Sequence, residues 1–489
     1  MDISRTNVKR LIDEHLHGFL VEEAFTITSV KAVKLLTPNR FDIAFKLFYL
    51  DIIGKEETIA RKLYKSHIDA FSLGEFTEPG NFEKNSIEKY YQEFSKICKG
   101  MRAQGFSIEK SLIPVSKDTT ILNGSHRIAS AIVENLPVKV IELAAKSDNY
   151  SYDFFYKRGM SSLHLDIAAT KFIEYADNVY VAIIWPSAVL NNENISNLFP
   201  NIVYQKNVKL NNTGAHNLIS QIYYGETWIG NEQNNFSGAL DKLLECFRTY
   251  SAIKVVAFQA DTITDVLEIK QNVRDICKIG KHSIHITDNK CESIRVSRAL
   301  FNDNSVHMLN YANPNRYLHV HDDIAKIKAF ADRSGLDCSD FAIDTSMVLA
   351  LYGLRPAQDI DLLCSEGHIE DTPAGISLHD DELRYHIAGK GDLIYNPDHY
   401  FYFNGLKFVS FDSVFEMKKR RNENKDVHDC NMMSALIERK RFKQFMASTF
   451  QSLLYTRAKL RSKCVLFLKY VGLYTFLKLL YLKLGDRNG

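Results

Sequence analysis

The sequence has no Cys-x-x-Cys pair, no low-complexity tract and few prolines. The absence of paired cysteines argues against a zinc site. The ten prolines and the lack of biased segments leave little room for long disordered linkers. No signal peptide opens the chain, so we expect a cytoplasmic protein with reduced cysteines. The eight cysteines are Cys98, Cys246, Cys277, Cys291, Cys338, Cys364, Cys430 and Cys464.

Neither sign of charge is in excess. The chain has 61 Lys and Arg against 59 Asp and Glu, a formal net charge of +2. This balance gives no reason to expect general binding to nucleic acid. Apolar residues make up 45% and charged residues 25% of the chain, as in ordinary globular proteins. At 489 residues the chain is too long for one core, and we expect about two to four domains.

The first 60 residues carry packing patterns but no motif. The spacing of apolar residues predicts an amphipathic helix from Val8 to Leu20. The apolar run from Phe41 to Ile53 is strand-like. We expect this region to pack against the segment that begins near residue 60.

A polar turn around Gly124 is the clearest candidate for an anion-binding site. The stretch reads Ile121-Leu122-Asn123-Gly124-Ser125-His126-Arg127-Ile128-Ala129-Ser130. Its apolar start and the helically spaced apolar residues after it predict a strand, a short loop and a helix. Gly124 lets the backbone approach a ligand, and the following N–H groups would lie at the positive end of the helix. His126 and Arg127 add donors that suit phosphate oxygens. The alternative is a structural turn in which Asn123 or Ser125 caps the helix.

The motifs around this turn also carry a family resemblance. They are Gly105-Phe106, Leu112-Ile113-Pro114-Val115, Asn123-Gly124-Ser125-His126-Arg127 and Val138-Lys139-Val140. Over roughly residues 60–145 the chain resembles the ParB/sulfiredoxin-like fold. In that superfamily a Gly-x-His-Arg turn binds nucleotide phosphates and some members are small-molecule kinases, which implies nucleotide binding by Gly124 to Arg127. Asn123 stands where an Asp often precedes the Gly. A kinase needs a carboxylate to accept the proton of the acceptor hydroxyl; Glu78 and Glu75 are candidates, and solvated surface glutamates are the alternative.

The middle of the chain predicts a new domain with buried strands. We expect strands over 178–186, 202–210 and 253–258, and helices over 217–224, 239–249, 265–276 and 292–301. Two short motifs are Trp185-Pro186 and Ser283-Ile284-His285-Ile286-Thr287-Asp288. Together with the element order, they resemble nucleoside diphosphate kinase, which implies a ferredoxin-like fold. In this resemblance His285 corresponds to the phosphoryl-accepting histidine, and Lys270 and Arg274 to phosphate contacts. Trp185 replaces a lysine of that family, and Ile286 replaces a glycine.

This resemblance has a chemical rationale. A neutral imidazole is a competent nucleophile toward phosphorus that bears a good leaving group. Lysine and arginine neutralise charge on the transferred group. The alternatives are that His285 is a hydrogen-bonded structural residue, or that the domain keeps only a pocket for nucleotide or phosphate.

Two carboxylates define the third candidate site. Asp359 and Asp361 are spaced i and i+2, so on a strand they point to one face and can share a divalent cation. A strand, a helix and a short loop before such a pair resemble the polymerase-β-type nucleotidyltransferases, which implies that the pair holds Mg²⁺ against a triphosphate. Asp344-Thr345-Ser346 stands where that family has Gly-Gly or Gly-Ser. For the third carboxylate, expected on a later strand, the candidates are Asp392 and then Asp398. The alternative is an acidic strand end with a structural role.

The tail, residues 441–489, is basic and apolar. Lys469 and Lys478 interrupt its apolar runs well short of a membrane span. A basic helix rich in Leu, Phe and Tyr is typical of an interfacial membrane helix. The alternative is a helix that docks on the body of the protein or on a partner.

Together these patterns predict a multidomain α/β and α+β protein that handles nucleotides. We expect a phosphoryl or nucleotidyl transferase that uses ATP or another nucleoside triphosphate with Mg²⁺. The acceptor would be cytoplasmic, for example a glycan or lipid-linked sugar of surface polysaccharide synthesis, with the tail on the membrane surface. Two alternatives stay open: a ParB-like nucleic-acid-associated protein, and an inactive nucleotide-binding scaffold. The expected segments are 1–148 (ParB/sulfiredoxin-like), 149–312 (nucleoside diphosphate kinase-like), 313–440 (nucleotidyltransferase-like) and 441–489 (helical tail).

Overall fold

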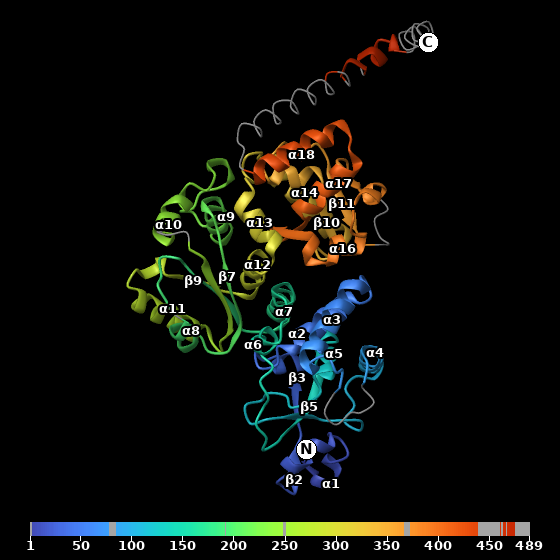
Figure 1. Ribbon diagram of the computed structural model, residues 1–489, viewed down its shortest axis with the longest axis vertical. Helices are drawn as coiled ribbons and strands as arrows, with labels where there is room; N and C mark the ends of the chain where they lie inside the picture. The colour runs from blue at the N-terminus through green and yellow to red at the C-terminus, as the bar shows by residue number, and fades with distance from the viewer. Residues whose placement is uncertain are drawn as a thin grey trace.

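The computed structural model is a mixed α/β protein with several small sheets, as the sequence predicts. Figure 1 shows the blue N-terminal unit at the bottom, the green middle unit on the left and the orange third unit above. Within the described residues, no helix is both long and apolar enough to cross a membrane. The described residues are 2–77, 85–190, 192–247, 251–365 and 372–438, with 460, 463–465 and 467–474 of the tail.

The N-terminal unit surrounds a small sheet with helices. Its elements are β1 (Asp2–Ser4), α1 (Arg5–Val8), η1 (Glu14–Phe19), β2 (Ala24–Thr26), β3 (Thr28–Lys31), η2 (Ala32–Leu35), α2 (Asp42–Ile52), α3 (Glu57–Ser72), α4 (Ile87–Gln104), β4 (Ile113–Val115), α5 (Ser125–Val133) and β5 (Pro137–Glu142). Strand β5 lies between β3, to which it is antiparallel, and β4, to which it is parallel. A separate antiparallel ribbon joins β1 to β2.

Two sequence expectations for this unit are wrong. Instead of one helix from Val8 to Leu20, α1 ends at Val8 and a 3₁₀ turn follows at Glu14–Phe19. The expected strand in residues 41–53 is helix α2, which is buried on almost every side. A continuous apolar run fits a fully buried helix as well as a buried strand. The i,i+4 ion pair of Lys46 with Asp42, at 2.9 Å, is compatible only with the helix.

The middle unit is built on an antiparallel four-stranded sheet within the described residues, in the order β7-β8-β6-β9. Its elements are α6 (Tyr152–Lys157), α7 (Ser162–Tyr175), β6 (Val179–Ile184), α8 (Asn192–Leu198), β7 (Ile202–Val208), α9 (Asn212–Ile222), η3 (Glu232–Asn234), α10 (Gly238–Cys246), β8 (Ile253–Gln259), α11 (Ile263–Cys277), η4 (Gly280–His282), β9 (Ile284–Ile286), α12 (Lys290–Leu300) and α13 (Asp303–Tyr311). The strands and helices expected here are confirmed, with ends shifted by a few residues.

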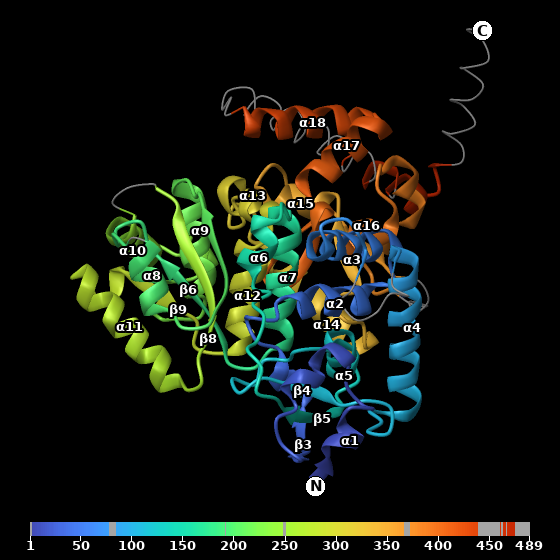
Figure 2. The ribbon, with the colours of Figure 1, turned by 60° about the horizontal axis from the view of Figure 1, so that its bottom comes forward.

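Alternation along the strands gives this sheet two buried faces. Ala182 and Ile184 of β6 pack in a core with residues of α8 and α11. Val181 and Ile183, which point the other way, belong to the large core that includes α7 and α12. Figure 2 shows α8 and α11 on one side of the sheet and α7 and α12 on the other.

The third unit holds a mixed sheet in the order β12-β11-β10-β14-β13. Its elements are α14 (His319–Ser334), β10 (Phe341–Asp344), α15 (Ser346–Leu351), β11 (Ile360–Cys364), β12 (Ile376–Leu378), η5 (Asp380–Tyr385), α16 (Lys390–Tyr395), η6 (Pro397–His399), β13 (Tyr400–Phe403), β14 (Leu406–Val409), α17 (Phe411–Arg421) and α18 (Asn424–Ile437). Strand β10 is antiparallel to β11 and parallel to β14. The turn at Asn404-Gly405, both with positive φ, closes the β13–β14 hairpin.

The three units share one continuous hydrophobic core. Helix α7 of the middle unit packs on α2 of the first, and the rings of Phe45 and Phe155 meet edge to face with centroids 5.1 Å apart. Lys55 at the end of α2 forms a 2.6 Å ion pair with Asp340 of the third unit. The units therefore stabilise one another across the segment boundaries expected from the sequence.

Candidate functional site

The turn at Gly124 opens α5 as the sequence predicts, but the residues directly before it, 121–123, do not form the expected strand. Ile121 forms only an isolated bridge. Gly124 is the N-cap with φ 95°, and a Cβ atom there would lie 2.8 Å from Cδ1 of Ile113. The N-cap is therefore neither Asn123 nor Ser125, although Asn123 Oδ1 accepts a hydrogen bond from the Gly124 N–H. Glycine is required here both by its backbone conformation and by its close packing.

The donors of this turn contact the protein itself. His126 Nε2 lies 2.7 Å from the hydroxyl of Tyr64, and the ring meets Phe94 edge to face. Arg127 donates from Nη1 to the Leu112 carbonyl at 3.2 Å. These contacts fix both side chains in the packing of the N-terminal unit.

The two glutamates considered as a kinase base have no described role at this turn. Glu75 follows the end of α3 and is exposed. Glu78 lies outside the described residues. Glu75 therefore fits the alternative of a solvated surface glutamate.

The middle unit brings Lys270, Arg274 and His285 to one cavity of about 820 Å³, as the family resemblance implies. Lys242 and Trp228 also line it, and Trp228 is 45% exposed. The sequence signals for these two residues are weak because they lie on separate elements. Cations and aromatic surface in one cavity can bind phosphate and stack a planar group.

The cations of this cavity are only partly compensated. Lys270 Nζ is 3.5 Å from the Ile286 carbonyl and 3.6 Å from a carboxylate oxygen of Asp288. Among the described residues, Arg274 Nε has no hydrogen-bond partner. Burial lowers the pKa of Lys242, and the neighbouring cations lower it further. A bound anion would stabilise all three cations.

His285 on β9 is oriented by a carboxylate. Its Nε2 donates to Glu292 Oε1 at 3.0 Å, and Tyr223 packs against the ring edge to face. Burial alone would raise the pKa of Glu292, but the His285 hydrogen bond and the N–H of Asp288 hold it below its usual value. Since Nε2 donates, Nδ1 of a neutral ring carries the lone pair. This arrangement suits a nucleophilic histidine and also a structural one.

Trp185, which replaces a lysine in the family resemblance, is a core residue. Its side chain is fully buried and packs against Phe247 with ring centroids 5.6 Å apart. No cation is supplied to the cavity at this position.

In the third unit, Asp361 lies at the centre of a polar row across three strands. It faces Asp344 on β10 and Ser377 on β12 in the strand register. Residues opposite each other on neighbouring strands share one face of the sheet. The Ser377 hydroxyl donates to Asp361 Oδ1 at 3.1 Å, and the Thr345 hydroxyl donates to Oδ2. Asp359, two residues earlier, is exposed and accepts a 2.9 Å hydrogen bond from Ser346.

This row becomes more buried toward Asp344. Asp344 is fully buried, and its Oδ2 accepts hydrogen bonds from His379 Nδ1 and His386 Nε2, both at 3.0 Å. Burial opposes its ionisation, but the two histidines hold its pKa well below the usual range. For Asp361, burial is the largest cause and raises the pKa. Asp344, whose negative charge is stabilised by two histidines, thus lies beside Asp361, whose negative charge is disfavoured by burial.

The tight turn between β10 and α15 carries backbone strain. Thr345 has φ 46° and ψ −105°, a region that costs a β-branched residue about 1–3 kcal/mol. Its N–H donates to Asp344 Oδ1 at 2.8 Å while its hydroxyl binds Asp361. The strained residue therefore joins the two carboxylates.

Among the described residues, no later strand supplies the expected third carboxylate. The strand next to β11, β12, has Ser377 opposite Asp361. Asp392 lies in the first turn of α16 and accepts a hydrogen bond from Asn396, and Asp398 is exposed in η6. Neither belongs to the row.

Asp361 of the row and the nearby Asp359 offer two carboxylates, rather than a full cage, for a divalent cation. Within the described residues, no group of three or more His, Cys, Asp or Glu side chains is arranged to hold a metal ion. Mg²⁺ is commonly held by one or two carboxylates together with substrate phosphates and water. Asp359 and Asp361 fit that mode, because both supply hard oxygens and a cation would stabilise the disfavoured charge of Asp361.

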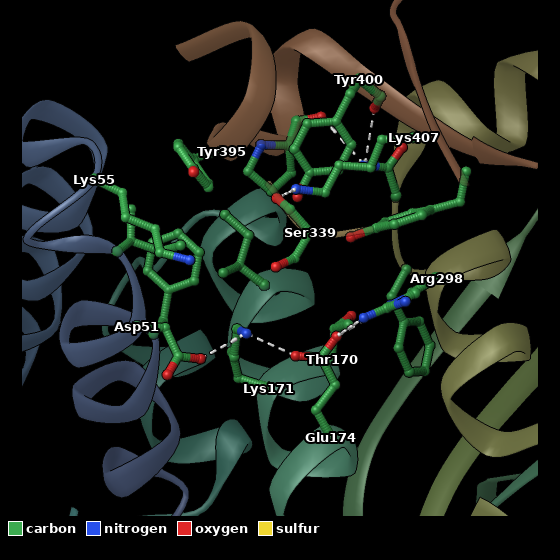
Figure 3. A pocket seen from close by; sticks show the side chains of 17 residues that line it. Asp51, Lys55, Thr170, Lys171, Glu174, Arg298, Ser339, Tyr395, Tyr400 and Lys407 are labelled. Carbon is green, nitrogen blue, oxygen red and sulfur yellow. Dashed lines mark hydrogen bonds and ion pairs between the residues drawn. The ribbon is translucent and has the colours of Figure 1, made fainter. Parts of the chain in front are cut away.

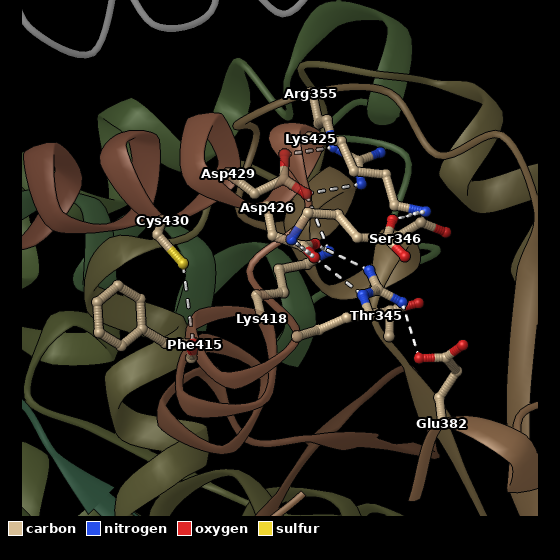
Figure 4. A network of polar contacts seen from close by, with 12 residues as sticks. Thr345, Ser346, Arg355, Glu382, Phe415, Lys418, Lys425, Asp426, Asp429 and Cys430 are labelled. Carbon is tan, nitrogen blue, oxygen red and sulfur yellow. Dashed lines mark hydrogen bonds and ion pairs between the residues drawn. The ribbon is translucent and has the colours of Figure 1, made fainter. Parts of the chain in front are cut away.

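A buried ionic network lies beside the turn at Thr345 and Ser346 (Figure 4). Arg355 pairs through two nitrogens with Asp429, at 2.8 and 3.0 Å. Lys418 lies 2.9 Å from Asp429 and 3.3 Å from Asp426, and Arg421 pairs with Asp426 at 2.8 Å. The basic run Lys418-Lys419-Arg420-Arg421 is thus partly internal, because Lys418 is 1% exposed. The network joins Arg355, four residues after α15, to α17 and α18.

Comparison of the chain with protein-family models, with curated proteins and with solved structures finds no match.

Proposed function

We propose that the protein is a nucleotide-dependent transferase whose third unit transfers a nucleotidyl group. The observation that carries the proposal is the facing pair of Asp344 and Asp361, with the exposed Asp359 two residues before Asp361, at the turn between β10 and α15. Asp361 on β11, Asp359 just before that strand and the mixed sheet support a likeness to polymerase-β-type nucleotidyltransferases. The strained turn supports it too, because strain concentrates where a ligand is held.

In this reaction the acceptor oxygen bonds to the α-phosphorus of the nucleotide. The bond between the α- and β-phosphates breaks, and pyrophosphate leaves. Asp359, the exposed carboxylate of the pair, accepts the proton of the acceptor hydroxyl. Asp361 and Asp359 would hold Mg²⁺, which supplies charge neutralisation on the phosphates when it is bound. Asp344 is too buried to touch substrate and acts by positioning Thr345 and His379.

The middle unit favours a second activity, phosphoryl transfer through His285. The interleaved strand order β7-β8-β6-β9 supports a ferredoxin-like fold, and three cationic or imidazole side chains of the resemblance line one cavity. In this step His285 Nδ1 bonds to the γ-phosphorus, and the nucleoside diphosphate leaves with the bridging oxygen. The acceptor for either transfer is a cytoplasmic glycan or lipid-linked sugar in this proposal. A membrane-surface role for the tail stays part of it.

Labelled nucleotides separate the two activities. The full chain is incubated with α-³²P- or γ-³²P-nucleoside triphosphates, Mg²⁺ and cell extract. Transfer of α-label that Asp361→Asn abolishes supports nucleotidyl transfer, and acid-labile γ-label on the protein that His285→Ala abolishes supports phosphoryl transfer. Asp392→Asn is the matched control and should keep both. No transfer of either label, with nucleotide still bound, would indicate the scaffold alternative. Salt-dependent DNA binding at physiological ionic strength would indicate the nucleic-acid alternative.

A further inference from the structure

A separate cavity of about 280 Å³ lies where the three units meet (Figure 3). Its walls include Lys55 from the first unit, Lys171 and Arg298 from the middle unit, and Lys407 from the third. Its volume lies near the lower end of the roughly 300–1,000 Å³ typical of small-molecule sites. It is distinct from the row at Asp361 and from the His285 cavity.

Two carboxylates partly neutralise this cavity. Lys171 lies 2.7 Å from Asp51 and 2.7 Å from Glu174, and Arg298 lies 2.7 Å from the same Glu174. The dashed contacts in Figure 3 show this chain along the cavity floor. Four cations and two carboxylates line the cavity, and Lys55 is also paired with Asp340 at 2.6 Å, so these groups together carry an excess of one positive charge when all are ionised.

Lys407 has the least compensated charge in the lining. It is 4% exposed and donates to the carbonyls of Ser339 and Ile394, both at 2.7 Å. The rings of Tyr395 and Tyr400 lie 5.3 and 4.8 Å from Nζ. Within the described part of the chain, no carboxylate lies within ion-pair distance of it.

The electrostatics at Lys407 favour an incoming anion. Burial is the largest cause that lowers the pKa of Lys407, and the charges of Lys171 and Arg298 lower it further, to about 7. A buried ammonium without a counter-ion is costly unless it loses its proton or gains a partner. An anion in the cavity would supply that partner.

We propose that this cavity binds a small oxyanion with phosphate or carboxylate groups, which contacts Lys407 and fastens the three units together. The excess of positive charge around the cavity favours an anionic ligand. Because the walls come from α2, α7, α12 and β14, the ligand favours the assembled arrangement over any state in which the units separate. The cavity is thus a candidate effector site.

The test measures thermal unfolding and calorimetric binding of the full chain with inorganic phosphate or malonate at pH 7. Sodium chloride at equal ionic strength is the reference. We expect one of the two anions to raise the unfolding temperature by a few degrees above the chloride value, because a ligand that binds only the folded state stabilises it. A response to phosphate alone identifies phosphate chemistry, and a response to malonate alone identifies carboxylate chemistry. No response to either overturns the proposal.

Variants locate the binding. Lys407→Met should weaken binding about 10-fold or more, as expected for loss of a charged hydrogen bond. Lys55→Met, whose lysine side chain is 40% exposed at the rim and so can be replaced without disturbing the core, should weaken it several-fold. Lys390→Met, on α16 outside the lining, should bind like the wild type. Asp361→Asn should also bind normally, which separates this site from the proposed transferase site. Unchanged binding in Lys55→Met, together with unchanged binding or misfolding in Lys407→Met, overturns the assignment.

Discussion

Asp344 and Asp361 face each other across the β10–β11 ladder, and Thr345 donates a hydrogen bond to each of them. Their environments differ: two histidines stabilise the ionised form of Asp344, while burial disfavours the ionised form of Asp361. Because the charge of Asp361 is disfavoured and Asp344 beside it is held ionised, a bound cation would strongly stabilise the ionised form of Asp361.

Asp361→Asn should abolish Mg²⁺-dependent binding of nucleoside triphosphate. The substitution keeps the shape of the side chain but removes a charged oxygen ligand from the proposed pair. Titration calorimetry with and without Mg²⁺ measures the effect, and circular dichroism checks the fold. Asp392→Asn serves as the control. Equal Mg²⁺-dependent affinity in the wild type and in Asp361→Asn would remove Asp361 from the site.

The His379–Asp344 pair should make stability depend on pH. Burial alone would lower the pKa of His379, but the hydrogen bond and charge of Asp344 raise it above its ordinary value. The contribution of His379 to the free energy of unfolding is therefore complete below its unfolded-state pKa of about 6.5. It is lost as pH rises through its pKa in the folded protein.

Urea denaturation between about pH 5.5 and 8.5 tests this dependence. The stability of the wild type should fall toward high pH relative to His379→Gln. The difference between the wild type and His15→Gln, which replaces an exposed residue in the N-terminal unit, should stay constant. A constant difference for both variants would contradict the assignment.

Arg355→Met should lower the free energy of unfolding by about 3–5 kcal/mol, the range for breaking a buried ion pair. The loss arises because Asp429 is fully buried and its two-pronged contact with Arg355 is removed, although its ion pair with Lys418 stays. Lys425→Met, which replaces an exposed lysine paired with Glu423, should cause no measurable loss. Chemical denaturation compares both variants with the wild type. Equal stability of the two variants would show that the network is energetically neutral.

Gly124→Ala should destabilise the protein more than Gly74→Ala. Both glycines have positive φ, 95° and 85°, so both substitutions carry the same kind of backbone strain. Only at Gly124 does the added Cβ meet other atoms, Cδ1 of Ile113 at 2.8 Å among them. We expect an additional loss of about 1–3 kcal/mol, as for overpacking in a core. Thermal or chemical denaturation gives the difference, and equal losses would contradict the steric account.

The sequence predicts the elements that have a clear local pattern. The strands around Val181, Val203 and Val255 are predictable because each is a short run of apolar and β-branched residues between turn signals. Helix α2 is not, because its burial on all sides removes the amphipathic pattern. Its burial depends on α7, more than a hundred residues later, and no local window contains that information.

Each candidate site likewise contains residues that the sequence predicts and partners that it does not. The spacing of Asp359 and Asp361 is visible in the sequence, and so is the departure from the family pattern at Asp344. The partners of Asp344, however, are His379 and His386, which follow 35 and 42 positions later. The pKa of Lys407 is likewise lowered by burial and by Lys171 and Arg298, which belong to the middle unit. Charges that titrate in response to distant neighbours leave no local signature.

The contact between α2 and α7 limits how the protein can be divided. A polypeptide that ends at residue 148 would lack Phe172 and Phe155. The ring of Phe172 stacks on Phe41 with centroids 6.3 Å apart, and the ring of Phe155 packs against Phe45. Such a fragment would present a bare aromatic surface to water and should self-associate. Extension through Tyr175 would restore this cover, so proteolytic fragments that survive should retain α7 with the N-terminal unit.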